Sequence, residues 1–498
     1  VLARLIDVRV TEHTIDELGS VLSQIGRTVF GEGVVFMVLQ AATMGILVLA
    51  ANTAYQDFPR LSAILANDRL MPRQMRNRGD RLVYSNGIVA LSAAAMGLIL
   101  VFDATLSRLI QLYVVGVFVS FTLSQTSMVR RWWRSREPGW RRSMAINAIG
   151  ATTTGVVLVV VATAKFSRGA WVVVVAIPLL VLGMSRIQRH YEWVATQLSL
   201  FRNRREAPLR TEVVVLVSHI SRATVQALTY ARLLGADQMR AVHIEEGPRD
   251  QFWLDWQAPN PDFPLTVIRP RRRSLVRPLK SFIRDIRWEH PRTRVIVVIP
   301  ELIGEPRWFW RATHHRATRI GGGLLGMRDL VVVRISVASR PLARGEEVAP
   351  PPTERIVVIP VGGVTQATLD AVAFVTWTRP SAVYAVHAEL DPEYSERTVR
   401  EWNINVHDVP LEVVSNPYRA TTPVILDYIE QKRAASPSGT VIEVIVPEFV
   451  VPTPLGRMLH NRTAFALKAN LSRYPDVITT SVPWLLQDEA DAYSTREV

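Results

Sequence analysis

The sequence predicts a multi-pass α-helical membrane domain in its first 190 residues, followed by a soluble half made of two tandem α/β lobes. Three observations indicate this fold class. Apolar runs long enough to cross a bilayer recur in the first half, and arginines gather at alternate connections between them. In the second half, strand-like and helix-like patterns alternate. A chain of 498 residues has room for two or three compact units.

The composition is both basic and hydrophobic. The formal net charge is +14 and the mean hydropathy is +0.15, a pairing typical of membrane helices with arginine-rich flanks. Nucleic-acid binding is the alternative for so basic a chain, but the arginines lie beside apolar runs instead of forming one stripe. We therefore predict membrane lipids as partners and no nucleic acid. The absence of cysteine excludes disulfides, thiolate nucleophiles and cysteine-ligated metals.

Residues 1–30 are mixed and polar and lack the pattern of a signal peptide. Apolar residues at helical spacing between Leu18 and Ile25 predict one short amphipathic helix there. We interpret 1–30 as an external loop that carries this helix. Because the chain starts without methionine, we expect the natural protein to extend further upstream.

Five apolar runs follow, and each is predicted to form a transmembrane helix within 31–190. An α-helix rises about 1.5 Å per residue, so about 20 residues cover the hydrocarbon core. Buried helices of a large soluble protein are the alternative interpretation, which the regular alternation of charge disfavours. Glycines inside the spans are predicted to be helix-packing sites. The runs lie near 34–52, 85–102, 107–128, 143–164 and 169–186, and the glycines are Gly87, Gly97, Gly150 and Gly155.

Arginines occupy every second connection between the runs. The connections 60–81, 130–142 and 186–190 are basic, whereas 103–105 and 165–169 are short and weakly charged. By the positive-inside rule the basic connections are cytoplasmic. The sequence therefore predicts an inner (plasma) membrane protein with an outside N-terminus and a cytoplasmic C-terminal half.

Two polar stretches interrupt the apolar pattern. The first lies in the arginine-studded, amphipathic segment 52–81, which is predicted to be cytoplasmic. Its motif 52–60 contains a proline that a helix tolerates at its start or at a kink, and an arginine that could meet lipid phosphates. In the second stretch, 112–125, Tyr113 needs a partner or a watery cavity in the hydrocarbon region. The motif residues are Asn52, Asp57, Pro59 and Arg60.

Taken together, the stretches 52–60 and 112–125 resemble the amino acid–polyamine–organocation permease superfamily and, within it, the KimA-like potassium importers of the KUP group. The resemblance implies that the five spans are helices eight to twelve of a twelve-helix transporter, so the chain would be a C-terminal fragment of a LeuT-type fold. It implies that Tyr113 lines the substrate path, and the segment 57–60 within the motif is interpreted as structural or gating. The helices that build most of the midplane site in such folds would lie upstream.

The soluble half begins with a predicted linker helix and basic linker at 191–210. Buried-strand patterns then alternate with amphipathic helices, which predicts a doubly wound parallel sheet. The pattern repeats at an offset of about 144–147 residues, as when 241–244 (AVHI) is answered by 385–388 (AVHA). We therefore predict lobe 1 at 211–345, a proline-rich linker at 346–352 and lobe 2 at 353–498. The order of elements resembles the universal stress protein fold and the cytosolic tail of the same transporter family.

Glycines in the soluble half are the candidates for a nucleotide site. Gly362 and Gly363 follow the first strand of lobe 2, where a phosphate could meet a helix N-terminus, so they are candidate anion or nucleotide contacts. The run 321–326 precedes a strand and lacks a P-loop lysine, so we predict a flexible turn. His314 and His315 have no carboxylate or cysteine at metal-ligand spacing, so we predict no metal.

The function that these features favour is secondary transport. By resemblance the cargo is potassium with proton coupling, and an amino acid is the alternative. The tail is expected to be regulatory or to form a homodimer interface, with no cofactor beyond a cytosolic nucleotide effector; the resemblance implies a cyclic dinucleotide. A membrane-anchored signalling protein with nucleotide-binding lobes is the rival class. A membrane enzyme would need a convergent acid, base or nucleophile at the bilayer boundary, and we find no such catalytic group.

Overall fold

A computed structural model of the protein divides the chain into two compact units. One is a helical unit within residues 1–189, and the other is an α/β unit that begins at His190. The external loop predicted at 1–30 is described only from residue 21, and the proline-rich linker 346–352 lies outside the described residues. The structure describes residues 21–76, 83–166, 170–200, 208–218, 221–245, 256, 263–269, 275–303, 317–338, 354–417, 420–437, 439–451, 456, 459–460, 462–474 and 477–486.

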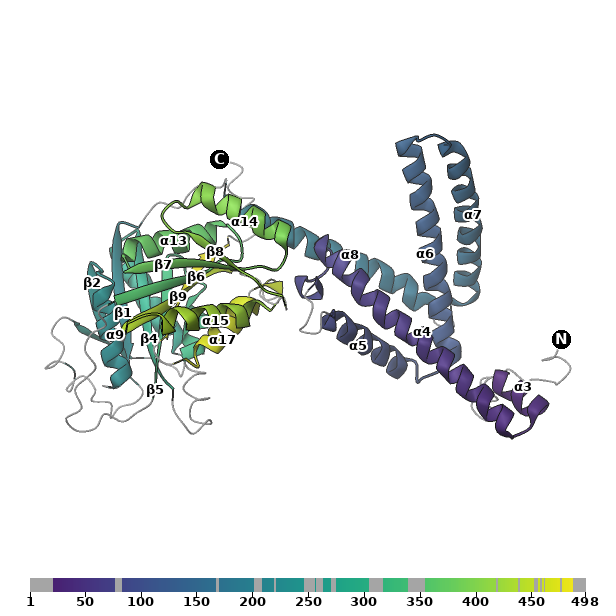
Figure 1. Ribbon diagram of the computed structural model, residues 1–498, viewed down its shortest axis with the longest axis horizontal. Helices are drawn as coiled ribbons and strands as arrows, with labels where there is room; N and C mark the ends of the chain where they lie inside the picture. The colour runs from purple at the N-terminus through teal and green to yellow at the C-terminus, as the bar shows by residue number, and fades with distance from the viewer. Residues whose placement is uncertain are drawn as a thin grey trace. The chain divides into compact units, whose positions relative to one another are not determined.

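All five apolar runs form helices, drawn as α4 to α8 in Figure 1. Four of these helices are long and apolar enough to cross a membrane, whereas α5 is apolar but has only 17 residues. At about 1.5 Å per residue, α5 is a few ångströms short of the usual hydrocarbon thickness. The helices are α3 (Val21–Phe30), α4 (Val34–Asn67), α5 (Ser85–Val101), α6 (Leu106–Ser135), α7 (Trp140–Ala164) and α8 (Ala170–Gln197), with a short 3₁₀ turn at Arg73–Arg76.

Two helices run further than their apolar sequences predict. Helix α4 continues through Pro59 to Asn67, so the motif 52–60 belongs to the same helix as the first apolar run. Helix α8 continues to Gln197, so the linker helix predicted within 191–210 is not a separate element. In both cases no glycine or proline directly follows the apolar run, so the strongest signals for a helix end are absent there.

The α/β unit is built on one ten-stranded sheet. Its strand order is β3-β2-β1-β4-β5-β10-β9-β6-β7-β8, and every neighbouring pair is parallel except β5 with β10. The strands are β1 (Arg210–Val217), β2 (Gln238–Ile244), β3 (Leu265–Ile268), β4 (Thr293–Ile303), β5 (Leu330–Ala338), β6 (Glu354–Pro360), β7 (Ala382–Ala388), β8 (Leu411–Val414), β9 (Thr440–Val450) and β10 (Val477–Leu485).

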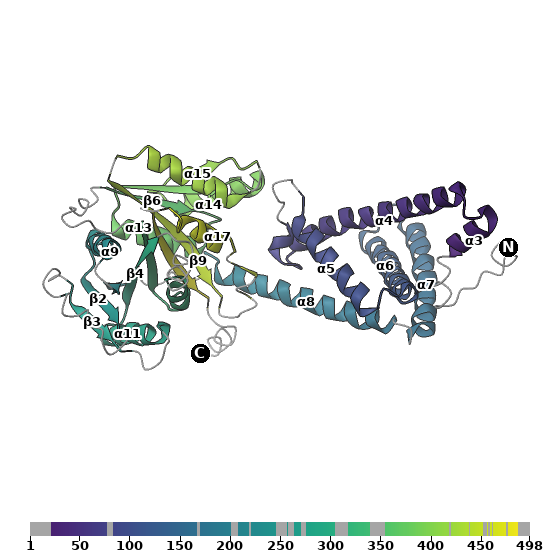
Figure 2. The same ribbon diagram turned by 90° about the horizontal axis from the view of Figure 1, so that it is seen from below.

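Helices cover both faces of the sheet (Figures 1 and 2). Continuous β-branched runs such as Val213–Val215 are buried on both faces, as expected for the inner strands of a parallel sheet. One face carries α9 (Arg222–Leu233), α13 (Gln366–Thr378) and α14 (Pro392–Asn405). The other face carries α11 (Val276–Glu289), the helical segment 317–324, α15 (Thr421–Ala434) and α17 (Arg462–Leu471).

The two predicted lobes therefore share one continuous sheet and do not form two separate domains. Strands β1 to β5 belong to lobe 1 and β6 to β10 to lobe 2, and the antiparallel pairing of β5 with β10 joins them. Both strands are buried along almost their whole length, so neither could remain an edge strand facing water. One apolar cluster on the α9/α13 face contains side chains from both lobes.

The internal repeat extends to individual hydrogen bonds. A buried histidine on the second strand of each lobe bonds through Nδ1 to a carbonyl at the end of the first strand. These distances are 2.8 Å for His243 to Val217 O and 2.7 Å for His387 to Val361 O. The first helix of each lobe is capped by a hydroxyl, from Ser221 in lobe 1 and Thr365 in lobe 2, which accepts a backbone N–H at 3.3 Å.

The flexible turn predicted at 321–326 is wrong for its first residues. Gly321 to Gly323 form the end of the helical segment 317–324. A Cβ on Gly323 would lie 2.7 Å from a methyl of Val276, the first residue of α11. Glycine therefore allows this segment to pack closely against α11, and close packing overrides the low helix propensity of glycine.

Candidate functional site

Helices α4 and α5 contact each other through the motif that the sequence singled out. Asn52, Asp57 and Arg60 are exposed on α4, whereas Pro59 is buried. A Cβ on Gly87 of α5 would lie 2.8 Å from the Cα of Pro59, so the two backbones touch. This observation assigns the motif's proline a packing role.

Helices α6 and α7 are held together by small and hydroxyl-bearing residues. The Thr122 hydroxyl bonds to Phe118 O at 2.7 Å and to the Thr154 hydroxyl at 3.1 Å. A Cβ on Gly150 would lie 3.2 Å from the side chain of Gln125. Such contacts are typical of helices that associate within lipid. The packing role predicted for the glycines therefore fits Gly87, Gly150 and Gly155, whereas a Cβ on Gly97 would meet no atom within 4 Å.

Tyr113 lies near the start of α6, and its side chain is 71% exposed. The described helices therefore do not enclose it in a site. Its substrate-lining role remains a prediction.

The connection between α6 and α7 is rich in arginine and tryptophan. The guanidinium carbons of Arg136 and Arg141 lie 5.9 and 5.5 Å from the ring centroid of Trp140, and that of Arg131 lies 5.8 Å from the ring of Trp132. Tryptophan rings with adjacent cations are typical of the membrane–water interface, where the ring enters the headgroup layer and the cation meets phosphate.

The loop with Gly362 and Gly363 lies between β6 and α13, as the sequence predicts, but its helix N-terminus is partly occupied. The backbone N–H of Gln366 donates to Leu198 O at 3.3 Å, and its side-chain Nε2 donates to Leu200 O at 3.2 Å. The Tyr394 hydroxyl donates to Gly362 O at 2.9 Å. The chain's own carbonyls thus bind where a phosphate would be expected, and an anion contact here remains a prediction.

The residues after position 189 in α8 pack against lobe 2, although lobe 1 follows them in the sequence. His190 Nε2 lies 3.2 Å from His460 Nε2. Val194 is buried with Ala367 and side chains from the ends of β9 and β10, including Trp484. Together with Gln366, these contacts attach the end of α8 to lobe 2.

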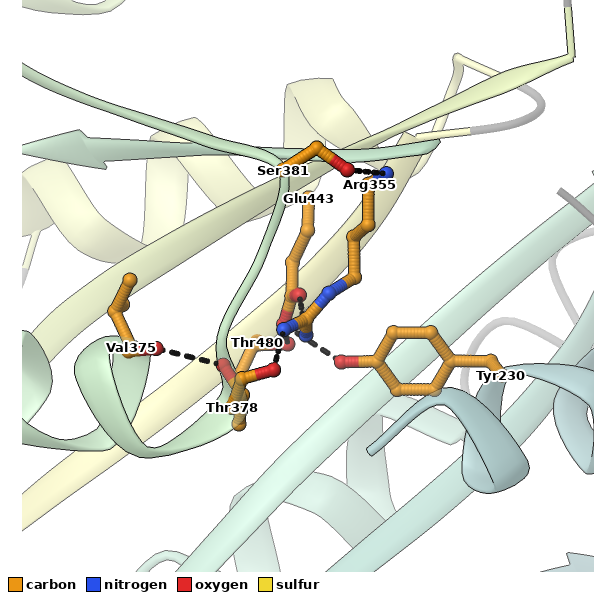
Figure 3. A network of polar contacts seen from close by, with 7 residues as sticks. All are labelled: Tyr230, Arg355, Val375, Thr378, Ser381, Glu443 and Thr480. Atoms are coloured by element: carbon orange, nitrogen blue, oxygen red, sulfur yellow. Dashed lines mark hydrogen bonds and ion pairs between the residues drawn. The ribbon is translucent and has the colours of Figure 1, made fainter. Parts of the chain in front are cut away.

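A buried polar network crosses the boundary between the lobes (Figure 3). Tyr230, on α9 of lobe 1, donates to Glu443 Oε1 on β9 of lobe 2 at 2.7 Å, and the Thr480 hydroxyl donates to the same oxygen. Arg355 Nη1 donates to Glu443 Oε2 at 2.9 Å, and its Nη2 donates to Thr378 O at 2.7 Å. Burial and the neighbouring Glu443 carboxylate raise the pKa of Tyr230 well above 10, so its hydroxyl remains a donor.

A second buried carboxyl lies in lobe 1. Glu212, on β1, is fully buried and pairs with Arg240 at 2.5 Å from Nε to Oε1. Burial raises the pKa of Glu212 above its ordinary value of 4.5, and Arg240 opposes part of that rise. Within the described ranges, no group of three or more histidines and carboxylates is placed to hold a metal ion.

The helices and the sheet together define the class of the protein: a multi-pass membrane protein of permease type with an α/β tail. Its residues 10–184 match the family described as Amino acid permease.

The tail gives a narrower assignment. The family described as KimA potassium transporter C-terminal domain matches residues 209–337 and 353–484, which together make up just over half of the chain. The chain therefore belongs to this family.

One curated relative is the potassium transporter KimA of Bacillus subtilis (strain 168). It is 35% identical over 320 residues, which cover 64% of this chain and 52% of the relative. The chain thus spans about half the length of the curated relative that it matches.

Proposed function

We propose that this protein works in proton-coupled potassium uptake across the plasma membrane, as a secondary transporter with a regulatory tail. The observation that carries the proposal is the match of both lobes, 209–337 and 353–484, to the potassium transporter C-terminal domain. The helical unit supports it with apolar spans that pack through glycine, threonine and a proline motif, as carrier helices do. The partial LeuT-type arrangement of these spans is part of the proposal.

The proposed topology has the tail in the cytoplasm. The six arginines between Arg130 and Arg142 flank the end of α6 and the start of α7, and by the positive-inside rule this end faces inward. Successive crossings by α7 and α8 bring residue 190 back to the same side. Because the chain has no cysteine, single cysteines at Ser135 and Glu396 can test this by labelling of intact cells with an impermeant maleimide. Labelling of either position without lysis would contradict the topology.

The tail is proposed to act on the membrane helices through the contact of α8 with lobe 2. Gln366 donates hydrogen bonds to the carbonyls of Leu198 and Leu200, which follow α8, and residues 190–194 pack against the same lobe. Any rearrangement of lobe 2 at the start of α13 therefore moves the end of α8. A cytosolic nucleotide that approached Gly362 or Gly363 would meet this contact directly, which makes the loop the proposed point of regulation.

Two further features of the tail complete the proposal. The five-stranded order of each lobe supports a universal-stress-protein type of fold, in which a central first strand is flanked by the second and fourth. A homodimer is proposed because the tail exposes large apolar side chains such as Trp288 and Ile404, which a second copy could cover.

Uptake in a bacterial strain that lacks its own potassium importers tests the main proposal. Cells that express the protein from its whole natural gene should grow at limiting potassium and take up rubidium as a tracer, and dissipating the proton gradient should stop the uptake. Cells with an empty vector are the control. Growth no better than the vector's, with the protein present in the membrane, would overturn the potassium assignment without touching the fold.

Amino acid transport is the second candidate, because residues 10–184 match the family described as Amino acid permease. The same cells distinguish the two: potassium transport predicts that an excess of mixed amino acids leaves rubidium uptake unchanged. Accumulation of a labelled amino acid without rubidium uptake would favour the alternative.

The regulatory contact is tested by Gln366→Ala, which removes one side-chain hydrogen bond worth about 1 kcal/mol. This should lower about fivefold the ratio of molecules in which the end of α8 is bound to lobe 2 to those in which it is released. We expect at least a twofold change in uptake rate. Arg222→Ala is the matched control, because Arg222 has the equivalent place at the start of α9 in lobe 1. Equal effects of the two substitutions would contradict a special role for lobe 2.

A further inference from the structure

The junction between the lobes has an approximate two-fold axis. Val333 is the fourth residue of β5 and Thr480 the fourth residue of β10, and these two residues lie opposite each other in the antiparallel pair. Every contact on one side of this axis therefore has an equivalent position on the other side, with the lobes exchanged. The two halves of the junction can be compared residue by residue.

The polar half uses a hydroxyl from lobe 1 and a carboxylate from lobe 2. Tyr230 is the ninth residue after the N-cap of α9, and Glu443 is the fourth residue of β9. Arg355 and Thr480 also donate hydrogen bonds to the Glu443 carboxylate, and all four side chains are buried. Figure 3 shows the tyrosine ring reaching from α9 toward the carboxylate.

The other half is apolar at the equivalent positions. Phe374 is the ninth residue after the N-cap of α13, and Ile296 is the fourth residue of β4. Phe374, Ile296 and Val333 belong to the same buried apolar cluster. Beside them, Arg294 of lobe 1 pairs with Asp370 of lobe 2 at 3.1 Å and lies 5.8 Å from the Phe374 ring centroid.

Pairing of like lobes would mismatch both halves. Two copies of lobe 1 would place the hydroxyl of Tyr230 against the side chains of Ile296 and Val333, which carry no hydrogen-bond acceptor. Two copies of lobe 2 would place Phe374 against Glu443, and Asp370 would face Val441 in place of an arginine. Each mismatch would occur twice because of the two-fold axis, and buried polar groups without partners are strongly disfavoured.

We propose that this junction is a recognition surface that selects an unlike lobe as its partner: lobe 1 pairs with lobe 2, and each lobe rejects a second copy of itself. Two independent pairs carry the selection, Tyr230 with Glu443 and Arg294 with Asp370. A buried polar group that fixes the choice of partner is the best supported use of such groups. The inference rests on the junction alone and does not depend on the transported substrate.

Cysteine reporters in the 498-residue chain, which has no cysteine of its own, can measure which lobes pair. Val332→Cys with Ser481→Cys places thiols on cross-strand partners of the native junction. Thr479→Cys with Ser481→Cys reports like pairing, because the two-fold axis at Thr480 would set residue 479 of one chain opposite 481 of another. Within one strand these positions are about 7 Å apart, beyond the Cβ separation of about 4 Å that a disulfide needs.

The decisive variant is Phe374→Tyr, made in the like-pairing reporter and purified in detergent. It gives lobe 2 both the hydroxyl and the carboxylate, so two copies of lobe 2 become complementary. After mild oxidation we expect at least fivefold more covalent dimer than in the unchanged reporter. Phe374→Leu is the matched control, since it perturbs the same core without adding a donor and should show no gain.

A second variant tests the other pair and does not depend on the aromatic site. Val441→Arg gives lobe 2 a cation that can meet Asp370 of a second lobe 2, at a position that is only partly buried. It should raise the covalent dimer severalfold above Val441→Gln. The native reporter, carried in parallel, shows which variants still fold.

The yield of covalent dimer in each variant, relative to its control, decides the proposal. A gain in covalent dimer with Phe374→Tyr over Phe374→Leu, or with Val441→Arg over Val441→Gln, supports selection of the unlike lobe. Equal dimer in each variant and its control overturns the proposal, as does abundant like-paired dimer in the unchanged reporter. If Phe374→Tyr prevents folding, the Val441 pair alone decides.

Discussion

The two units of this protein bring their elements together by different chemistry. In the helical unit the closest contacts are made by glycine, proline and threonine, and the large apolar side chains of α4 and α8 point outward. In the α/β unit the large side chains are inside, and even charged groups such as Glu443 and Arg355 are buried. Lipid gives helices no hydrophobic reason to associate, whereas water drives the sheet and its helices together.

The largest expected effect comes from the buried charges of the α/β unit. Glu443→Ala would leave Arg355 buried without its carboxylate, and we expect a loss of about 3–5 kcal/mol in the free energy of unfolding of the tail. Urea unfolding followed by tryptophan fluorescence measures it. Glu396→Ala is the control, because Glu396 is exposed and forms a surface ion pair with Arg400, so its loss should be below about 1 kcal/mol. Similar losses would contradict the assigned role of burial.

The helical unit should be most sensitive at its backbone contact. Gly87→Ala places a methyl 2.8 Å from the Cα of Pro59, where no side chain can move away, and overpacking of this kind costs about 1–3 kcal/mol. We expect a lower melting temperature in detergent and reduced uptake. In Gly97→Ala on the same helix the new methyl meets nothing within 4 Å, so that variant should be neutral or slightly more stable. The reverse order would refute the packing of α4 on α5.

A matched pair of substitutions compares the two units directly. Thr480→Val removes a hydrogen bond to a buried carboxylate and should cost about 1.5–3 kcal/mol. Thr122→Val removes the bond to Thr154 between α6 and α7 and should cost only about 0.6 kcal/mol, the average for interhelical bonds in lipid. Thermal unfolding of both variants in the same detergent gives the comparison. Equal shifts would mean that the two units do not differ in this respect.

The smallest effect is a change in pH dependence at Glu212. Because burial raises its pKa in the folded chain, the folded state binds the proton more tightly than the unfolded state. Stability from this group is therefore greatest in acid and falls as pH rises from about 4.5 through the raised value. Glu212→Gln should remove that fall, which unfolding curves between pH 4 and 8 will show. An unchanged slope would argue against a raised pKa.

Local patterns predicted the elements well because most are set by neighbouring residues. The apolar runs expected near 85–102 and 143–164 form α5 and α7, each within a few residues of the predicted bounds. Gly87 was predicted as a packing site, and its contact with Pro59 explains why that position needs glycine. Gly97 has the same sequence signal without the contact, because sequence shows a small residue but not what faces it.

Long-range pairings were beyond prediction from local pattern. Tyr230 and Glu443 are 213 positions apart, and no periodicity links a helix of one lobe to a strand of the other. The fusion of two lobes into one sheet was missed for the same reason, since the antiparallel pairing of β5 with β10 depends on edges that only the folded lobes possess. The repeat itself offered the one usable signal. Tyr230 in lobe 1 occupies the position of Phe374 in lobe 2, and Glu443 in lobe 2 occupies the position of Ile296 in lobe 1, so a polar residue replaces an apolar one at each.

The attachment of α8 to the second lobe has a consequence for biosynthesis. Lobe 1 leaves the ribosome first, but the side chains that cover Val194, and Gln366, which donates to Leu198 O and Leu200 O, belong to residues 366–486. The apolar end of α8 must therefore remain uncovered through the translation of about 290 further residues, which at 5–20 residues per second takes about 15–60 s. A chaperone could bind the exposed apolar residues at this end of α8 during that interval and would be released when lobe 2 covers them.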